Sequence, residues 1–126
     1  MNENAKTAKL IKILNQIPQC YAQKRHGGRF QSGDPDVAGT YRGKSFFIEC
    51  KELGGTLTAL QADKLSRHAY AGAAALVAIY VGENTRVCYP TLPESWGRLV
   101  GPVKNMRGDN FPLDIVGVQT WLEAYL

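Results

Sequence analysis

Two acidic residues and one lysine have side chains and a spacing that suit shared chemistry. Asp36 precedes the apolar segment 37–41, and Glu49 and Lys51 lie two residues apart in the apolar segment 45–53. The residues between these segments favour a tight turn, so the pattern predicts a β-hairpin. Antiparallel pairing would then bring the three charged side chains to one place.

Two registers of this hairpin are open, and each gathers the charges. With Arg42-Gly43 as the two-residue loop, Asp36 faces Glu49, whereas with Gly43-Lys44 as the loop it faces Lys51. Opposed Cβ atoms in a sheet lie about 4.5–5.5 Å apart, so two carboxylates and one ammonium would share a small space. Because side chains alternate along a strand, Glu49 and Lys51 point to the same face.

Two carboxylates held this close repel each other unless a cation lies between them. Oxygen ligands without His or Cys favour Mg²⁺ or Mn²⁺, and a bound metal ion activates water and offsets charge on a phosphate. Lys51 would orient that water or stabilise the charged transition state. Charged residues beside turns are also common, so an exposed ion cluster is the alternative interpretation of these three residues.

The elements that position the three residues begin with an amphipathic helix predicted over 3–17, ending before Pro18. Residues 20–24 are predicted to form a short strand, and residues 25–34 form a Gly-rich basic loop. The apolar residues of the helix recur at spacings of three and four: Leu10, Ile13, Leu14 and Ile17.

A second helix is predicted from about residue 58 to 71, because Thr58 and Gln61 have the spacing of a capping box. The apolar run 74–81 predicts a central strand that is covered on both faces, and residues 85–90 predict its hairpin partner. The residues expected to point inward from the second helix are Leu60, Leu65, His68 and Ala69.

The rest of the chain is predicted to be a loop-rich segment from 90 to about 111 and a short helix around 118–126. The predicted order is helix, three strands, helix, two strands and helix, which is an α/β fold with a mixed sheet flanked by helices. The length of 126 residues favours one domain over 1–126.

Composition excludes several classes of protein. No apolar run approaches the roughly 20 residues of a membrane span, and the N-terminus lacks the pattern of a secretory signal, so we expect a cytoplasmic protein. Three widely spaced cysteines without a C-x-x-C pair predict buried thiols. The net charge of +4 suits a polyanionic partner without requiring one.

The segments GDPDVAG, FFIECK and GGTLTALQ together resemble the PD-(D/E)XK nuclease superfamily, and more closely its VRR-NUC branch, over roughly residues 3–81. The resemblance implies a restriction-endonuclease-like core, a Mg²⁺ or Mn²⁺ cofactor and phosphodiester hydrolysis. The residues that match the family site are Glu3, Asp36, Glu49, Lys51 and Gln61, with Glu3, Asp36 and Glu49 as metal ligands.

Two of these residues have structural alternatives. Gln61 suits a helix cap as well as a site, and Glu3 suits a solvated first-turn acid that favours the helix dipole. The basic residues around Gly27-Gly28 are candidates for phosphate binding, with a solvated loop as the alternative. These DNA-binding candidates are Lys24, Arg25 and Arg29.

The sequence therefore predicts a Mg²⁺- or Mn²⁺-dependent DNA endonuclease. The resemblance points to branched DNA such as four-way junctions, and two symmetric incisions by a chain with one site favour a homodimer. The alternatives are a monomeric flap or nicking nuclease, an accessory nuclease of replication or restriction, and a DNA-binding module with a vestigial metal site. The intact acidic residues argue against the last alternative.

Overall fold

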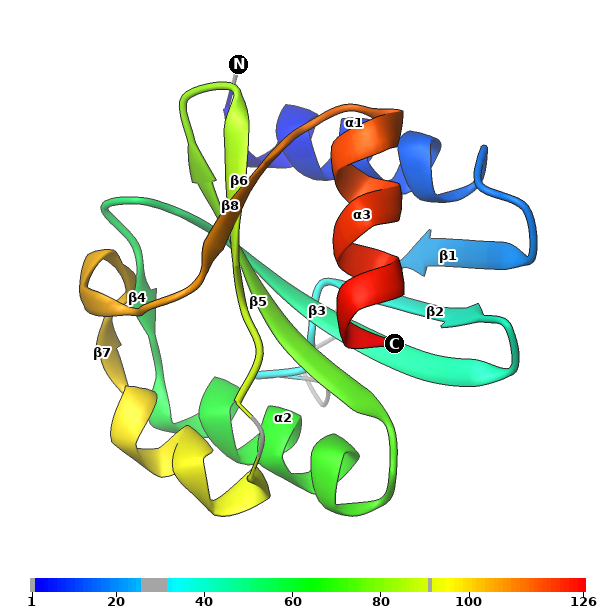
Figure 1. Cartoon of the computed structure of the whole chain (residues 1–126). Helices are drawn as coiled ribbons and strands as arrows, with labels where there is room; N and C mark the ends of the chain where they lie inside the picture. Colours follow the sequence, from blue (N-terminus) through cyan, green and yellow to red (C-terminus); the bar gives the residue numbers. More distant parts are fainter. Residues whose placement is uncertain (1, 26–31, 91) are drawn as a thin grey trace.

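The computed structural model describes residues 2–25, 32–90 and 92–126. A mixed sheet with strand order β1-β2-β3-β5-β6-β8 forms its centre, and β4 pairs separately with β7 (Figure 1). The strands are β1 (Cys20–Lys24), β2 (Val37–Tyr41), β3 (Lys44–Glu52), β4 (Thr56–Leu57), β5 (Ala74–Val81), β6 (Asn84–Cys88), β7 (Gly101–Pro102) and β8 (Asp109–Pro112). The helices are α1 (Glu3–Leu14), α2 (Ala59–Tyr70) and α3 (Ile115–Tyr125), with the 3₁₀ helices η1 (Pro93–Leu99) and η2 (Val103–Asn105).

Helices cover both faces of the sheet, as Figure 1 shows, with α1 and α3 on one face and α2 and η1 on the other. The first core contains Leu10 of α1 and Trp121 of α3, and the second contains Leu65 of α2 and Trp96 of η1. The apolar residues of β5 alternate between these two cores. The prediction of a mixed α/β fold with a doubly covered central strand is therefore confirmed.

The hairpin of β2 and β3 has the first of the two expected registers, with Tyr41 opposite Lys44. Arg42 has φ 49° and Gly43 has φ 83°, the left-handed backbone that a two-residue hairpin turn requires. The last ladder pair at the other end is Val37 with Ile48. If the register is continued by one residue beyond the ladder, Asp36 lies opposite Glu49.

The segment from β3 through α2 to β5 is a parallel crossover, since β3 and β5 pair in parallel from Phe46 with Ala74 to Glu52 with Tyr80. The helix begins at the predicted capping box, in which the side chains of Thr58 and Gln61 each bond the other residue's backbone N–H. This crossover places the start of α2 near the end of β3.

Several boundaries differ from the prediction. Helix α1 ends at Leu14 instead of continuing to residue 17, because the side-chain amide of Asn15 bonds both the N–H and the carbonyl of Ala22 in β1. Ile17 is still buried. The terminal helix begins three residues before the predicted start, at an Asp114 cap that accepts from the Gly117 N–H.

The prediction that Leu60 points inward is wrong, since its side chain is 46% exposed. Leu60 instead packs against Gly33, where an added Cβ would lie 2.5 Å from the Leu60 Cγ. The segment 90–111 also contains more structure than predicted, because β8 pairs with β6 at the sheet edge. A short edge strand without apolar alternation gives little signal in the sequence.

The cysteines are free thiols, with Cys50 and Cys88 buried as predicted and Cys20 half-buried. No helix in the described part of the chain is long and apolar enough to cross a membrane.

Candidate functional site

Strand β3 has one unpaired edge, which begins where β2 leaves it after the pair Val37 and Ile48. At this edge the Cys50 N–H donates to Oδ2 of Asp36 at 2.8 Å. A carboxylate thus takes the place of the carbonyl that a neighbouring strand would supply. In an extended strand the N–H and C=O of one residue face the same side, so the Cys50 carbonyl also faces this edge.

Glu49 is the acidic partner of Asp36 in the register, and it is only 3% exposed. Its Oε2 atom is buried and has no hydrogen-bond partner among the described residues. The nearest cation is Lys51, whose Nζ lies 4.0 Å from the other oxygen, Oε1. The Oε2 atom of Glu49 is therefore buried with neither a hydrogen bond nor a contact with the Lys51 ammonium group.

Burial, together with a hydrogen bond and the charge of Asp36, raises the pKa of Glu49 to about 9, although Lys51 opposes the shift. The ionised form of Glu49 is therefore disfavoured in the metal-free protein, and an added positive charge at this position would stabilise it.

Glu3 reaches the same edge from the first turn of α1. Burial and then the charge of Asp36 raise the pKa of Glu3, while Lys51 and a bond from the Glu52 backbone N–H lower it. Helix α1 is fixed here by the bond between the Thr7 and Tyr80 hydroxyl groups, 2.9 Å long. The structure thus brings Glu3 within electrostatic reach of Asp36, Glu49 and Lys51.

The donor set fits a hard divalent cation. A cation between Asp36 and Glu49 would offset the charge of both carboxylates and give the buried Oε2 atom of Glu49 a partner. Across the residues that the structure describes, no three His, Cys, Asp or Glu side chains are grouped closely enough to hold a metal ion by themselves. Two carboxylates, a backbone carbonyl and water are the coordination that these residues offer to Mg²⁺ or Mn²⁺.

Lys51 lies beside Glu49 with a side chain that is 14% exposed. Gly55 lets the chain turn closely beside it, since a Cβ on Gly55 would lie 3.1 Å from the Glu52 carbonyl oxygen and 3.4 Å from the Lys51 Cδ. Gln61 has the structural duty that the sequence left open, because its Oε1 accepts from the Thr58 N–H at 3.0 Å. The cap leaves the Nε2 group of Gln61 outside this bond.

The predicted DNA-binding residues have different surroundings. Lys24 is exposed at the end of β1, opposite Val37. The Arg25 guanidinium contacts Asp34 at 3.4 Å and lies 5.8 Å from the centre of the Phe47 ring. Arg29 lies outside the described residues.

Sequence reasoning missed two features near the site. Lys64 of α2 lies 3.6 Å from Asp34, and the rings of Phe47 and His68 stack with their centres 3.6 Å apart. Burial and then the charge of Arg25 lower the pKa of His68. The helical period carried a signal for Lys64, because this residue lies three positions after Gln61 on the same side of α2.

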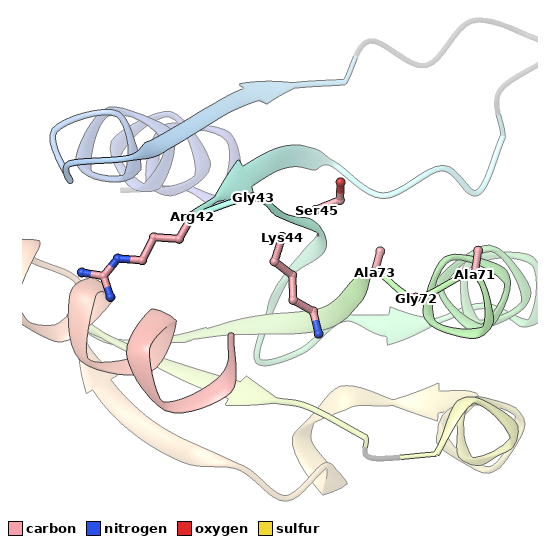
Figure 2. A pocket seen from close by; sticks show the side chains of 7 residues that line it. All are labelled: Arg42, Gly43, Lys44, Ser45, Ala71, Gly72 and Ala73. Atoms are coloured by element: carbon pink, nitrogen blue, oxygen red, sulfur yellow. The ribbon is translucent and has the colours of Figure 1, made fainter.

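A hollow of about 490 Å³ lies at the other end of β3 (Figure 2). Glu49 lies five positions after Lys44 in β3, so the hollow lies roughly 17 Å from the pair of Asp36 and Glu49 along the strand. In Figure 2 the Arg42 side chain points away from the turn at Gly72. The backbone N–H groups of Ala71, Gly72 and Ala73, which border the hollow, already donate to carbonyl groups of α2. The residues around the hollow are Arg42, Gly43, Lys44, Ser45, Ala71, Gly72 and Ala73.

Among solved structures, the fold is similar to that of Hjc from Archaeoglobus fulgidus, a Holliday junction resolvase from an archaeal hyperthermophile. The TM-score is 0.57 at 19% sequence identity, and the match covers 80% of this chain and 96% of the Hjc chain. No protein-family model and no curated protein matches the sequence. The restriction-endonuclease-like fold is confirmed, whereas the VRR-NUC branch remains a prediction.

Proposed function

We propose that this protein is a Mg²⁺- or Mn²⁺-dependent endonuclease that hydrolyses phosphodiester bonds in branched DNA. The observation that carries the proposal is the acidic pair of Asp36 and Glu49 at the open edge of β3, with a buried oxygen that lacks a partner. The restriction-endonuclease-like fold supports the same function. The order of the motifs supports a place in the VRR-NUC branch.

Four of the five predicted site residues have a role in the proposed reaction. Asp36 and Glu49 would hold the metal ion, and Glu3 would add a third acidic side chain from α1. A divalent metal ion lowers the pKa of bound water and offsets negative charge on the phosphate. Lys51 would orient the attacking water. The water oxygen bonds to phosphorus and gives up a proton to solvent, while the bond to the leaving oxygen breaks and that oxygen takes up a proton from solvent.

The proposal also covers the DNA substrate and the oligomeric state. The fold shared with a Holliday junction resolvase supports four-way junction DNA as the substrate. Resolving a junction needs two incisions, so two copies of a chain with one site would form a symmetric homodimer. The cytoplasm remains the proposed location.

The proposal is tested by incubating labelled four-way junction, flap and duplex DNA with Mg²⁺, Mn²⁺ or EDTA. Asp36→Asn and Lys51→Ala should remain folded and lose cleavage, because each removes a group at the reacting phosphate and neither leaves a core cavity. Cleavage that persists in EDTA or in Asp36→Asn would contradict the metal mechanism. Metal-dependent cutting of flaps by a monomer, with no cutting of junctions, would favour the alternative nuclease.

A further inference from the structure

One carboxylate beside the candidate site joins two basic side chains from different elements. Oδ2 of Asp34 lies 3.4 Å from Nη2 of Arg25, and its Oδ1 lies 3.6 Å from Nζ of Lys64. Arg25 follows β1, Lys64 belongs to α2, and Asp34 lies two residues before Asp36. We refer to Arg25, Asp34 and Lys64 as the Asp34 clamp. Its net charge is positive.

The Asp34 clamp is held next to the acidic pair. The Arg25 N–H donates to the Asp36 carbonyl at 2.8 Å, so this arginine is fixed to the residue that anchors the open edge of β3. Its guanidinium lies over Phe47, which is two residues before Glu49 and therefore on the same face of the strand. The clamp and the acidic pair thus face the same side of β3.

The clamp presents hydrogen-bond donors to solvent. The Asp34 side chain is 15% exposed, whereas the side chains of Arg25 and Lys64 are 33% and 34% exposed. Arginine has five N–H donors and lysine has three, and the contacts with Asp34 engage one nitrogen of each residue. Arginine and lysine donors are the groups that bind phosphate oxygens in nucleic acids.

Another ion pair on the same helix provides a contrast. Arg67 contacts Asp63 at 2.9 Å, and their side chains are 77% and 51% exposed. Arg67 borders a different hollow, together with Pro93 and Glu94. Both members of this ion pair belong to α2. This pair has the properties of an ordinary surface salt bridge, which contributes little to folding.

We propose that Arg25 and Lys64, held by Asp34, bind a backbone phosphate of the DNA strand next to the phosphate that is hydrolysed. The inference rests on the proposed nuclease function and extends it to a specific phosphate contact. Asp34 is a positioning residue, because it acts by holding the two basic side chains. The clamp fixes the register of the strand over the acidic pair.

The test compares Lys64→Gln with Arg67→Gln, since each removes one positive charge from α2. Binding of labelled four-way junction DNA is measured in EDTA by fluorescence anisotropy over a range of salt concentrations. Lys64→Gln should weaken binding about three- to tenfold and reduce the slope of log K against log salt by about one, because one phosphate contact is lost. Arg67→Gln should leave the slope unchanged, and Lys64→Arg should restore it.

Asp34→Asn tests the positioning role, because it keeps both basic residues and removes the group that holds them. Its salt slope should not fall, whereas kcat with Mg²⁺ or Mn²⁺ should fall about tenfold with little change in KM, since the strand is bound in a less productive register. An Asp34 with only a structural role would lower the melting temperature and leave kcat per folded molecule unchanged.

The outcomes separate the clamp from the proposed function. Equal salt slopes for Lys64→Gln and Arg67→Gln, in a preparation whose wild type cleaves DNA, would overturn the clamp and leave the nuclease function intact. A wild type that shows the expected slopes and never hydrolyses DNA would overturn the nuclease function and leave the phosphate contact standing. Melting curves of each variant confirm that the compared proteins are folded.

Discussion

Strand β3 is paired on both sides from Phe46 to Ile48, to β2 and to β5, whereas from Glu49 to Glu52 it is paired only to β5. Both ends of the strand carry a lysine, Lys44 at the start and Lys51 near the end. The groups around the two lysines differ. Lys44 borders an open hollow (Figure 2), and Lys51 lies beside two acidic side chains.

The comparison teaches that the site arises where backbone pairing stops. In the doubly paired half, the backbone N–H and C=O groups are used by neighbouring strands, so nothing draws acidic side chains toward the strand. In the open half, the Cys50 N–H takes a carboxylate of Asp36 as its partner. This bond holds Asp36 next to the buried Glu49, and a cation between the two carboxylates would stabilise their ionised forms.

The largest expected effect is a difference in cleavage rate between substitutions at the two ends of β3. Glu49→Gln should lower the single-turnover rate of junction cleavage about 10³-fold, because it removes a metal-binding charge from the reacting phosphate. Lys44→Gln at the other end of β3 should change the rate less than twofold or so, since it lies far from the acidic pair. An equal loss in both variants would mean that the two ends of β3 are not functionally distinct.

Much of this asymmetry could be predicted from the sequence. The RGK turn limits the hairpin to two registers, and period-two alternation places Glu49 and Lys51 on one face of β3. The capping box fixes the start of α2 within one residue. These features are local, because each depends on a few residues that are close together in the sequence.

The contacts between distant segments could not be predicted in the same way. The clamp joins Asp34 to Lys64, and Thr7 bonds Tyr80, across separations that no local period encodes. The apolar pattern of the helix places Leu60 in the core, but the turn at Gly33 gives its side chain another contact. Such contacts depend on how whole elements pack, which a single sequence does not specify residue by residue.

The second expected effect concerns stability without metal. The pKa of Glu49 is about 9 in the folded state against an ordinary value of 4.5, so the folded state binds more protons than the unfolded state between these values. The free energy of unfolding should therefore fall as pH rises from 5 to 9, because the unfolded state loses this proton first. Glu49→Gln should remove that part of the slope, measured by urea unfolding in EDTA.

The difference between wild type and Glu49→Gln is the informative quantity, because Cys50 and His68 titrate in both proteins. Mg²⁺ or Mn²⁺ should also flatten the wild-type slope, since a metal ion binds the deprotonated pair. Asp36→Asn should leave the metal-free fold nearly as stable as wild type, because the side-chain oxygen of the asparagine can still accept from the Cys50 N–H. A fall of many degrees in its melting temperature would assign Asp36 a structural role.

The smallest expected effect separates the two duties of Gln61. Thr58→Ala and Gln61→Ala each break the capping box and should cost about 0.5–2 kcal/mol of stability. Gln61 lies on the same side of α2 as Lys64, so we expect its Nε2 group to serve the site as well as the helix. Gln61→Ala should therefore lower the cleavage rate about tenfold relative to Thr58→Ala, under conditions where both are fully folded. Equal rates in the two variants would confine Gln61 to the cap and reduce the proposed site to the residues at the open edge of β3.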